Sequence, residues 1–216
     1  MSSPLTSALH VEPSPRNVVV CLSGGLDSIT LATKALNEGR LAYCVVFRYG
    51  QPHLEAEVHA ATVWCKNNNV VRVLCDLNLD GSTMSWGPTK PGPRELPGRN
   101  LVMLSHAVQM CLVARAPGAR LPTEVWFGPT LDDRNDYADC RPEFVAAVSQ
   151  LASIYGISVR APFIDMRKRE VVALARDLGV DIDATWSCYE PVWRGFTPTP
   201  CGGCNACLLR ASALQG

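Results

Sequence analysis

Near its N-terminus the chain reads VVVCLSGGLDS, from Val18 to Ser28, and this stretch decides the fold. The first five residues are apolar and mostly β-branched, which is typical of a buried strand. A Ser-Gly-Gly turn follows, and apolar residues then recur at helical spacing. The N–H groups of such a turn converge and the helix N-terminus adds partial positive charge, so the stretch predicts a phosphate site. Its spacing is not G-x-x-x-x-G-K-[ST], which argues against an ordinary kinase-type phosphate loop.

A tight turn that merely caps a helix, with Asp27 and Ser28 as capping residues, is the alternative for this stretch. The preceding strand and the presence of both polar residues favour phosphate binding. S-G-G-L-D-S is similar to the pyrophosphate loop of the ATP pyrophosphatases, which split ATP into AMP and pyrophosphate. This motif by itself identifies only that superfamily.

The composition limits the function classes. The 216 residues are 47% hydrophobic, and 20 basic residues balance 20 acidic ones. We expect one main domain at 17–183 and a metal-binding C-terminal region at 184–216. The lack of basic runs argues against direct nucleic-acid binding, and no apolar stretch is long enough for a membrane span. Residues 1–16 are rich in Ser and Pro and lack the apolar core of a signal peptide, so we expect a flexible leader and a cytoplasmic protein.

Strand patterns alternate with helix patterns along most of the chain. Strands are predicted at Val18–Leu22, Leu41–Phe47, Val70–Cys75, Glu124–Phe127 and Ile157–Arg160. Helices are predicted at Asp27–Glu38, His53–Asn68, Asn100–Arg115, Arg141–Tyr155 and Arg167–Leu178. The fold class is therefore α/β, with a five-stranded, mainly parallel, Rossmann-like sheet and helices on both faces. The Gly- and Pro-rich segment Leu77–Gly98 is too long for an ordinary connection, which favours a functional or mobile segment.

Ligands of parallel sheets bind at the carboxyl ends of the strands. This rule brings four segments to one predicted crevice: Ser23–Ser28, Arg48–Gln51, Gly128–Asp133 and Pro162–Lys168.

The ten cysteines fall into two groups. Six lie on apolar segments, where a thiol usually packs as a small hydrophobic group: Cys21, Cys44, Cys65, Cys75, Cys111 and Cys140. The others, Cys188, Cys201, Cys204 and Cys207, have the spacing C-x12-C-x2-C-x2-C. Four thiolates complete a tetrahedron around Zn²⁺ and leave no position for water, which favours a structural zinc site. An iron–sulfur cluster and a coincidence of spacing are the alternatives.

An ordered set of motifs resembles the 7-cyano-7-deazaguanine synthase family, which forms a nitrile in the queuosine pathway. The motifs lie at Ser23–Ser28, Tyr49–His53, Pro97–Asn100, Asp139–Phe144, Ala161–Phe163, Thr185–Tyr189 and Cys201–Arg210. The likeness runs from Val18 to about Leu214. The family usually has a glutamate three residues after the histidine of the second motif, where this chain has Ala56. It also usually has proline in place of Ala138.

The resemblance implies an adenine nucleotide alpha-hydrolase-like fold and an ATP-dependent carbon–nitrogen ligase. The substrates would be 7-carboxy-7-deazaguanine, ammonia and ATP, and the product 7-cyano-7-deazaguanine. Adenylation of the carboxylate creates AMP as a leaving group, which ammonia displaces to give an amide. A second adenylation, on the amide oxygen, gives the nitrile. The main demand is charge stabilisation on the departing pyrophosphate, with Mg²⁺ bound beside ATP. We assign no general base, because ammonia has its own lone pair.

The resemblance also implies a role for individual residues. Asp27 would bind or orient Mg²⁺, Lys168 would grip phosphate and Arg99 would pair with the substrate carboxylate, so we assign these three catalytic roles. A solvated lysine and a surface arginine at a capped helix are the alternatives. The ATP contacts would come from Leu22, Ser23, Gly24, Gly25, Leu26, Asp27, Ser28, Ile29, Thr30, Leu31, Ala32 and Phe47. The substrate contacts would come from Arg99, Asn100, Asp133, Tyr137, Asp139 and Arg141.

Two further groups of polar residues have weaker assignments. An acidic loop after the fourth strand holds Asp132, Asp133, Asp136 and Asp139. One or two of these are expected to bind Mg²⁺ or the amino groups of the base, and the others to face solvent. His53 and His59 are expected at the surface.

Two other functions stay open at this point. The first is a related adenylating enzyme, such as a tRNA thiolase, an amide-forming ligase or an enzyme that conjugates a deazapurine to another acceptor. A thiolase would need a spare cysteine pair and a basic RNA-binding domain, which this chain does not offer. The second is a non-catalytic zinc-ribbon module that binds a nucleotide. A homodimer is the expected oligomeric state.

Overall fold

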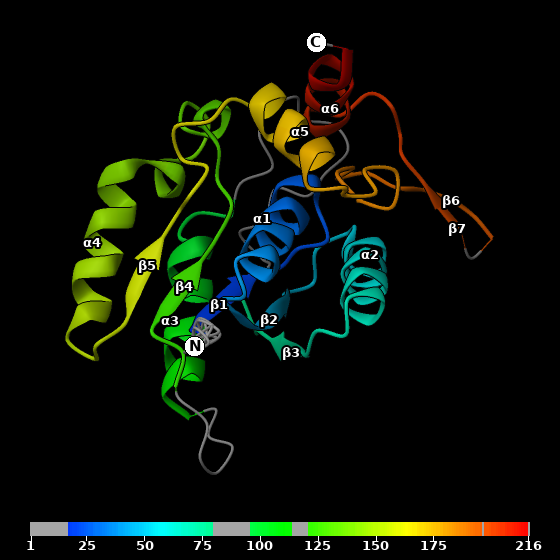
Figure 1. Cartoon of the computed structure of the whole chain (residues 1–216). Helices are drawn as coiled ribbons and strands as arrows, with labels where there is room; N and C mark the ends of the chain where they lie inside the picture. Colours follow the sequence, from blue (N-terminus) through cyan, green and yellow to red (C-terminus); the bar gives the residue numbers. More distant parts are fainter. Residues whose placement is uncertain (1–16, 80–95, 114–120, 196, 216) are drawn as a thin grey trace, which may run out of the picture.

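The computed structural model describes residues 17–79, 96–113, 121–195 and 197–215. Its main sheet holds β1 (Val18–Cys21), β2 (Leu41–Arg48), β3 (Arg72–Asp76), β4 (Glu124–Trp126) and β5 (Ser158–Arg160). The strand order is β3-β2-β1-β4-β5, and every neighbouring pair is parallel (Figure 1). The predicted five-stranded parallel sheet is confirmed. The leader prediction for residues 1–16, and most of the Leu77–Gly98 prediction, fall outside the described residues.

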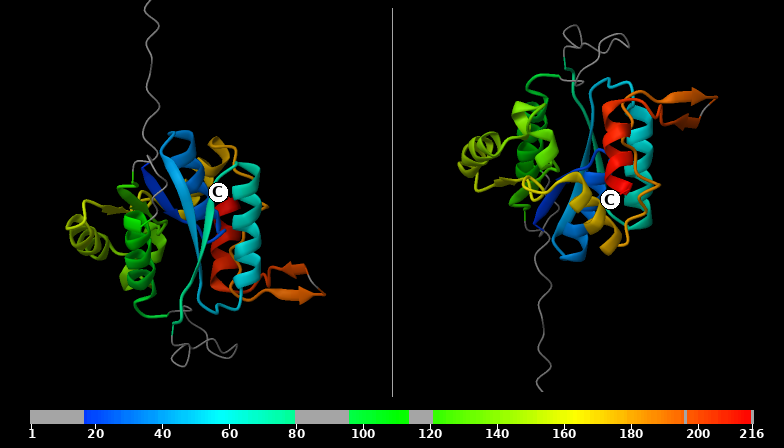
Figure 2. Two further views of the ribbon diagram at one scale, coloured as in Figure 1. Left: turned by 90° about the horizontal axis from the view of Figure 1, so that it is seen from below. Right: turned by 90° about the horizontal axis from the view of Figure 1, so that it is seen from above.

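Helices cover both faces of the sheet, as predicted (Figure 2). On one face, α3 (Arg99–Val113) and α4 (Pro142–Ser153) pack on the side of the strands that carries Val19, Val45 and Val125. On the other face, α1 (Leu26–Asn37), α2 (Leu54–Asn67) and α5 (Lys168–Asp177) pack on the side that carries Val18, Val20 and Val46. Successive strand residues point to opposite faces, so the uninterrupted apolar run of β1 supplies both cores.

The strand order explains where a ligand can enter. From β1 the chain passes outward to β2 and β3, and then returns to the other side of β1 to form β4 and β5. The loops that follow β1 and β4 therefore diverge, and a crevice opens between them at the carboxyl edge of the sheet. This switch point is where the glycine-rich turn lies.

The C-terminal region adds elements that the sequence analysis did not predict as such. A short antiparallel hairpin of β6 (Val192–Arg194) and β7 (Thr197–Thr199) stands away from the sheet (Figures 1 and 2). Helix α6 (Asn205–Gln215) follows and packs on α5, where Ala213 meets Val172 and Ala175. Three-residue strands carry too little alternation to be recognised in a sequence. Within the described ranges, no helix has both the length and the apolarity to cross a membrane.

Gly24 is the point of closest packing between the turn after β1 and helix α2. Its φ of +81° lies in the left-handed region, which favours glycine. A Cβ at this position would overlap the carbonyl oxygen of Glu57 and lie 3.0 Å from the backbone nitrogen of Ala61. Only glycine therefore lets the turn lie against the first turns of α2.

We expect Gly24→Ala to destabilise the protein by about 3–5 kcal/mol, because the left-handed conformation and the overlap with α2 both act against it. Urea denaturation followed by circular dichroism measures the change.

Gly39→Ala is the matched control, because Gly39 has a similar φ of +69° and nothing within 4 Å of an added Cβ. It should cost only about 1–2 kcal/mol, the strain of the left-handed conformation alone. Equal losses in the two variants would contradict the packing argument.

Candidate functional site

A cavity of about 460 Å³ lies at the carboxyl edge of the sheet. All four segments predicted to surround a crevice contribute to it, through Ser23 and Gly25–Ser28, Tyr49 and Gln51, Gly128, Pro129, Asp132 and Asp133, and Lys168. Its wall also includes the first residues of α3 and part of the C-terminal region. Aromatic side chains make up much of the remaining wall: Phe47, Tyr49, Phe127, Tyr137, Trp186 and Tyr189. The predicted crevice is confirmed, and it is large enough for a planar ring system together with phosphate groups.

The hydroxyl groups of Ser23 and Ser28 hold the glycine-rich turn, and Ser23 Oγ accepts from the backbone N–H of Gly25 at 3.3 Å. Ser28 Oγ accepts from the backbone N–H of Ser23 at 3.1 Å and donates to the carbonyl oxygen of Gly25 at 3.1 Å. The first intrahelical bond of α1 runs from Ile29 N to Gly25 O. The N–H groups of Leu26, Asp27 and Ser28 precede that bond, so no carbonyl of the helix accepts from them. They form the cluster of donors that an anion requires.

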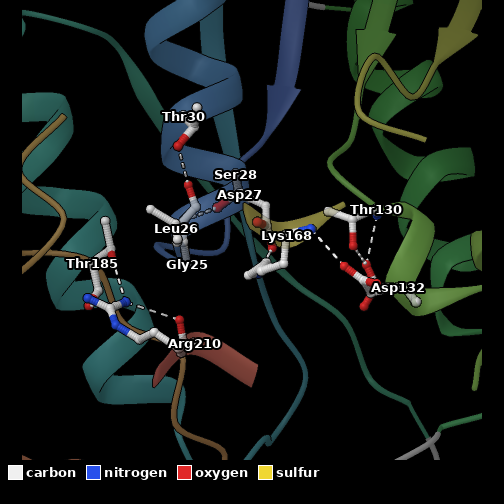
Figure 3. A network of polar contacts seen from close by, with 12 residues as sticks. Gly25, Leu26, Asp27, Ser28, Thr30, Thr130, Asp132, Lys168, Thr185 and Arg210 are labelled. Atoms are coloured by element: carbon white, nitrogen blue, oxygen red, sulfur yellow. Dashed lines mark hydrogen bonds and ion pairs between the residues drawn. The ribbon is translucent and has the colours of Figure 1, made fainter. Parts of the chain in front are cut away.

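Asp27 and Lys168 form a largely buried ion pair beside this turn (Figure 3). Lys168 is the first residue of α5, and its backbone N–H donates to Asp132 Oδ2 at 2.6 Å. Asp132 thus fixes the start of α5 and, with it, the lysine that reaches Asp27. The alternative of a solvated lysine is wrong, because the Lys168 side chain is only 13% exposed.

Asp27 also has one carboxylate oxygen that could bind a cation. Its Oδ1 atom is buried and has no hydrogen-bond partner among the described residues. Burial raises the pKa of Asp27, while the charge and hydrogen bond of Lys168 oppose that rise. A buried carboxylate oxygen without a donor, beside a cluster of N–H groups, fits a Mg²⁺ ion that accompanies phosphate.

Arg99 enters the cavity from the opposite side, at the start of α3. Its guanidinium group lies over the Tyr49 ring, 5.5 Å from the centroid, and Nη1 donates to Tyr49 Oη at 2.9 Å. Burial acts to lower the pKa of Arg99, but Tyr49 and nearby acidic groups outweigh it and raise the pKa. The group is therefore a fixed positive charge in the cavity. Asp139 supports it from outside the cavity by accepting from the backbone N–H of Asn100 at 3.1 Å.

Three polar residues on and just before α2 belong to the site, and the sequence analysis had not placed two of them, His53 and Glu57, there. Gln51 Nε2 donates to Glu57 Oε2 at 3.0 Å, and His53 Nε2 lies 3.5 Å from Glu57 Oε1. All three line the cavity. The surface assignment of His53 is wrong, because the residue is only 3% exposed and its ring packs on Tyr189. The exposed position of His59 is confirmed.

Glu57 lies one residue beyond Ala56, where the resembling family usually has its glutamate. Burial raises the pKa of Glu57 to about 7, against the opposing effects of the Gln51 hydrogen bond and the Arg99 charge. The sequence carried one signal for this carboxylate: Glu57 follows His53 by four residues, a spacing that brings two side chains together on one face of a helix.

Some residues of the predicted site do not line the cavity. Ile29, Leu31 and Ala32 point into the apolar core, and the Thr30 hydroxyl donates to Leu26 O at 2.7 Å within α1. Gly24 faces α2. Arg141 is exposed and donates to Arg134 O. The residues of the predicted set that do line it are Leu22, Ser23, Gly25, Leu26, Asp27, Ser28, Phe47, Arg99, Asn100, Asp133, Tyr137 and Lys168.

Most aspartates of the acidic loop accept hydrogen bonds that stabilise turns and helix starts. Asp133 Oδ2 accepts from both the backbone N–H and the hydroxyl of Thr130, each at 2.7 Å. Asp132 and Asp139 stabilise the starts of α5 and α3 in the same way. Asp132, Asp133 and Asp136 line the cavity, whereas Asp139 does not.

The four C-terminal cysteines converge as their spacing predicted. The sulfur atoms of Cys188, Cys201, Cys204 and Cys207 all lie within 4.8 Å of one another. Cys188 Sγ accepts from the backbone N–H groups of Glu190 and Cys201, and Cys201 Sγ accepts from that of Cys204. Such bonds stabilise thiolates, and four sulfurs bound to one tetrahedral ion lie about 3.8 Å apart. The cluster can therefore hold a metal ion.

The C-terminal region that carries the four cysteines also forms one wall of the cavity. Trp186 N donates to Gly24 O at 2.9 Å, which joins the segment before Cys188 directly to the glycine-rich turn. Arg210 of α6 holds the same segment through Ile182 O at 2.5 Å and the Thr185 hydroxyl at 2.6 Å (Figure 3). Arg210 thus fastens α6 to this segment.

These features define a class of protein: a parallel α/β nucleotide-binding fold with an anion-binding turn after the central first strand and a four-cysteine cluster beside it. Residues 17–216 match the family model described as "Queuosine biosynthesis protein QueC", so the chain belongs to that family.

Curated relatives match this chain over most of their own length. A 7-cyano-7-deazaguanine synthase from Ectopseudomonas mendocina is 36% identical and matches 93% of this chain and 94% of the relative. The protein of the same name from Frankia casuarinae is 34% identical over 92% of this chain and 89% of the relative.

Solved structures are more distant. The U34-tRNA thiolase NcsA from Methanococcus maripaludis, with its [4Fe-4S] cluster, is 14% identical at a TM-score of 0.45. The match covers 94% of this chain and 66% of that one. A likeness of this degree does not bear on the cysteine cluster or the reaction.

The raised pKa of Glu57 has a measurable effect on stability. Because the folded protein holds this proton more tightly than the unfolded chain, the stabilisation is complete below about pH 4.5 and is lost as the pH rises through 7. Relative to Glu57→Gln, the wild-type free energy of unfolding should fall by about 3 kcal/mol across that range. Urea denaturation at pH steps from 4.5 to 8 measures the difference.

Glu55→Gln is the control for this measurement, since Glu55 lies on the exposed side of the same helix turn. The stability difference between Glu55→Gln and wild type should stay flat over the same pH range. A flat difference for Glu57→Gln would contradict the raised pKa.

Proposed function

We propose that the protein converts 7-carboxy-7-deazaguanine, ammonia and two molecules of ATP into 7-cyano-7-deazaguanine, two AMP and two pyrophosphate. The observation that carries the proposal is the cavity of a QueC family member that joins an anion-binding turn to a buried arginine. The curated relatives that cover nine tenths of the chain carry the name of this reaction.

The two halves of the cavity suit the two substrates. The N–H groups of Leu26, Asp27 and Ser28 would bind the pyrophosphate part of ATP as it leaves. Lys168, held by Asp27 and fixed at the start of α5, would balance negative charge on the phosphates. Because these groups are already in place, they stabilise the developing charge without rearrangement.

Arg99 would hold the carboxylate of the deazapurine. Its stacking on Tyr49 leaves the guanidinium with few alternative positions, which favours a directed contact with an anion. The aromatic wall would enclose the planar ring, and the hydroxyl groups of Tyr137 and Tyr189 would bind its polar edge. Carboxylate and α-phosphate would thereby meet in the middle of the cavity, where the acyl adenylate must form.

Two metal ions belong to this proposal. Mg²⁺, held by Asp27 through its unpaired Oδ1, would offset the charge of the pyrophosphate. Zn²⁺, held by the four thiolates, would have a structural role, because four protein ligands leave no position for a substrate.

The direct test incubates purified protein with 7-carboxy-7-deazaguanine, ammonium and Mg-ATP, and identifies the products by mass spectrometry. We expect the nitrile, with two AMP and two pyrophosphate for each nitrile formed. Release of ADP and orthophosphate, or transfer of the deazapurine to another acceptor, would refute the proposal.

Asp27→Asn is the variant for this assay, because it keeps the size of the side chain and removes its charge. We expect turnover to fall at least about 10²-fold, with the fold intact by circular dichroism. Asp165→Asn is its control, since Asp165 is an exposed carboxylate that pairs with Arg134 and does not line the cavity. Full activity in Asp27→Asn would contradict the assignment of Asp27 to the phosphate site.

We expect Cys204→Ser to lose bound zinc and soluble yield together, because metal binding at such a site contributes folding free energy. Cys75→Ser, outside the cluster, should keep one zinc per chain. Elemental analysis of both purified variants measures the metal content, and absorption of visible light would indicate an iron–sulfur cluster instead. Unchanged zinc content in Cys204→Ser would contradict the four-ligand site.

A further inference from the structure

The proposed reaction, on which this inference rests, releases protons that some group must accept. Attack of ammonia on the acyl adenylate gives the amide and releases one proton. Conversion of the amide to the nitrile removes both N–H protons, because the nitrogen of a nitrile carries none. The lone pair of ammonia explains the first bond, but it does not remove protons from an adenylated amide. A proton acceptor in the cavity is therefore required for the second half of the reaction.

Glu57 is a carboxyl group that lines the cavity beside Arg99, the residue proposed to hold the substrate. It lies in the first turns of α2, whose backbone packs against Gly24 of the anion-binding turn. Its side chain is 15% exposed and lines the cavity together with Arg99. It is thus close both to the phosphate end and to the arginine proposed to hold the substrate carboxylate. Asp27 is unsuited to the task because it is already paired with Lys168.

The position of the Glu57 carboxyl group is fixed by its neighbours. Gln51 Nε2 bridges Glu57 Oε2 at 3.0 Å and Phe47 O at 3.2 Å, while Gln51 Oε1 accepts from Tyr49 N at 2.9 Å. Gln51 therefore ties the carboxyl group to the end of β2. The other oxygen, Oε1, lies 3.5 Å from His53 Nε2. One oxygen is held in place, and the other adjoins an imidazole that can pass a proton on.

The charged and titratable groups around Glu57 come from every element that packs on it. They are His53 at the start of α2, Tyr49 after β2, Arg99 of α3 and Tyr189 of the C-terminal segment. Burial dominates and raises the pKa of Glu57 to about 7. Near neutral pH the group therefore exists in both protonation states, as an efficient proton acceptor requires.

We infer that Glu57 is the proton acceptor in the dehydration of the amide to the nitrile. After adenylation of the amide oxygen, the C–O bond to AMP breaks and its electron pair leaves with AMP. The N–H bonding electrons form the new C–N π bonds as the protons pass in succession to Glu57. Between the two transfers Glu57 returns its proton to water, with His53 as the adjoining group. No oxidant or reductant takes part.

The test starts from the amide, 7-amido-7-deazaguanine, with Mg-ATP and the full zinc-loaded chain. This choice removes ammonia, whose own ionisation would otherwise enter the pH dependence. Glu57→Gln should form the nitrile at least about 10²-fold more slowly than wild type, with little change in KM for the amide. When the substrates are the acid and ammonium, this variant should accumulate the amide and its adenylate in place of the nitrile.

The pH profile gives a second readout that does not depend on the variant. For wild type, kcat from the amide should rise with pH and level off above about 7, because the acceptor is active when deprotonated. Glu57→Gln should lose this rise, whereas the Glu55→Gln control should keep it. If Glu57→Gln does not fold, a wild-type profile that is flat between pH 5.5 and 8.5 would overturn the inference by itself.

Other outcomes separate this inference from the proposed function. Nitrile formation by Glu57→Gln at the wild-type rate would overturn the proton role alone, with the function intact. A raised KM with unchanged kcat would also overturn it and would assign Glu57 to binding of the base. Wild-type protein that releases no pyrophosphate from either the acid or the amide would overturn the function together with the inference.

Discussion

The close packing of the Gly24 backbone is the constraint on which the rest of the site depends. On one side the residue lies against α2, where a Cβ would overlap Glu57 O, and on the other its carbonyl accepts from Trp186 N. The anion-binding turn is thus clamped between α2 and the segment that leads to the cysteine cluster. Three parts of the chain that are far apart in sequence form a single cavity because they meet at this glycine.

Charge is arranged in the cavity by burial and pairing. At the phosphate end, Asp27 pairs with Lys168, and Lys168 is fixed through the contact of its backbone with Asp132. At the other end, Arg99 donates a hydrogen bond to Tyr49. Its charge acts on the nearby Glu57, whose pKa is raised by burial. Positive groups can bind anions and a partly protonated carboxyl group can accept protons, so the two ends suit different steps of the proposed reaction. The cysteine cluster contributes indirectly, since its region supplies Trp186 and Tyr189 to the wall.

The sequence analysis succeeded where local pattern and spacing carry the signal. The apolar run at Val18–Leu22 predicted a buried strand, and the carboxyl-edge rule then placed Lys168 in the same crevice as the glycine-rich turn. It failed where the decisive contact is between distant residues. Ile29, Leu31 and Ala32 follow the motif directly, but the helical period turns their side chains into the core. His53 is polar and follows a turn, yet packing against Tyr189 buries it.

By itself, the sequence determined the α/β class, the position of the anion-binding turn and the convergence of the four cysteines. These features depend on the period of apolar residues and on short spacings, both of which are local properties of the chain. Only the tertiary structure decided that Asp27 pairs with Lys168, that Glu57 is a buried carboxyl group beside Arg99, and that the C-terminal region closes the cavity. Burial and charge depend on what packs around a side chain, and those neighbours come from elements that the fold alone brings together.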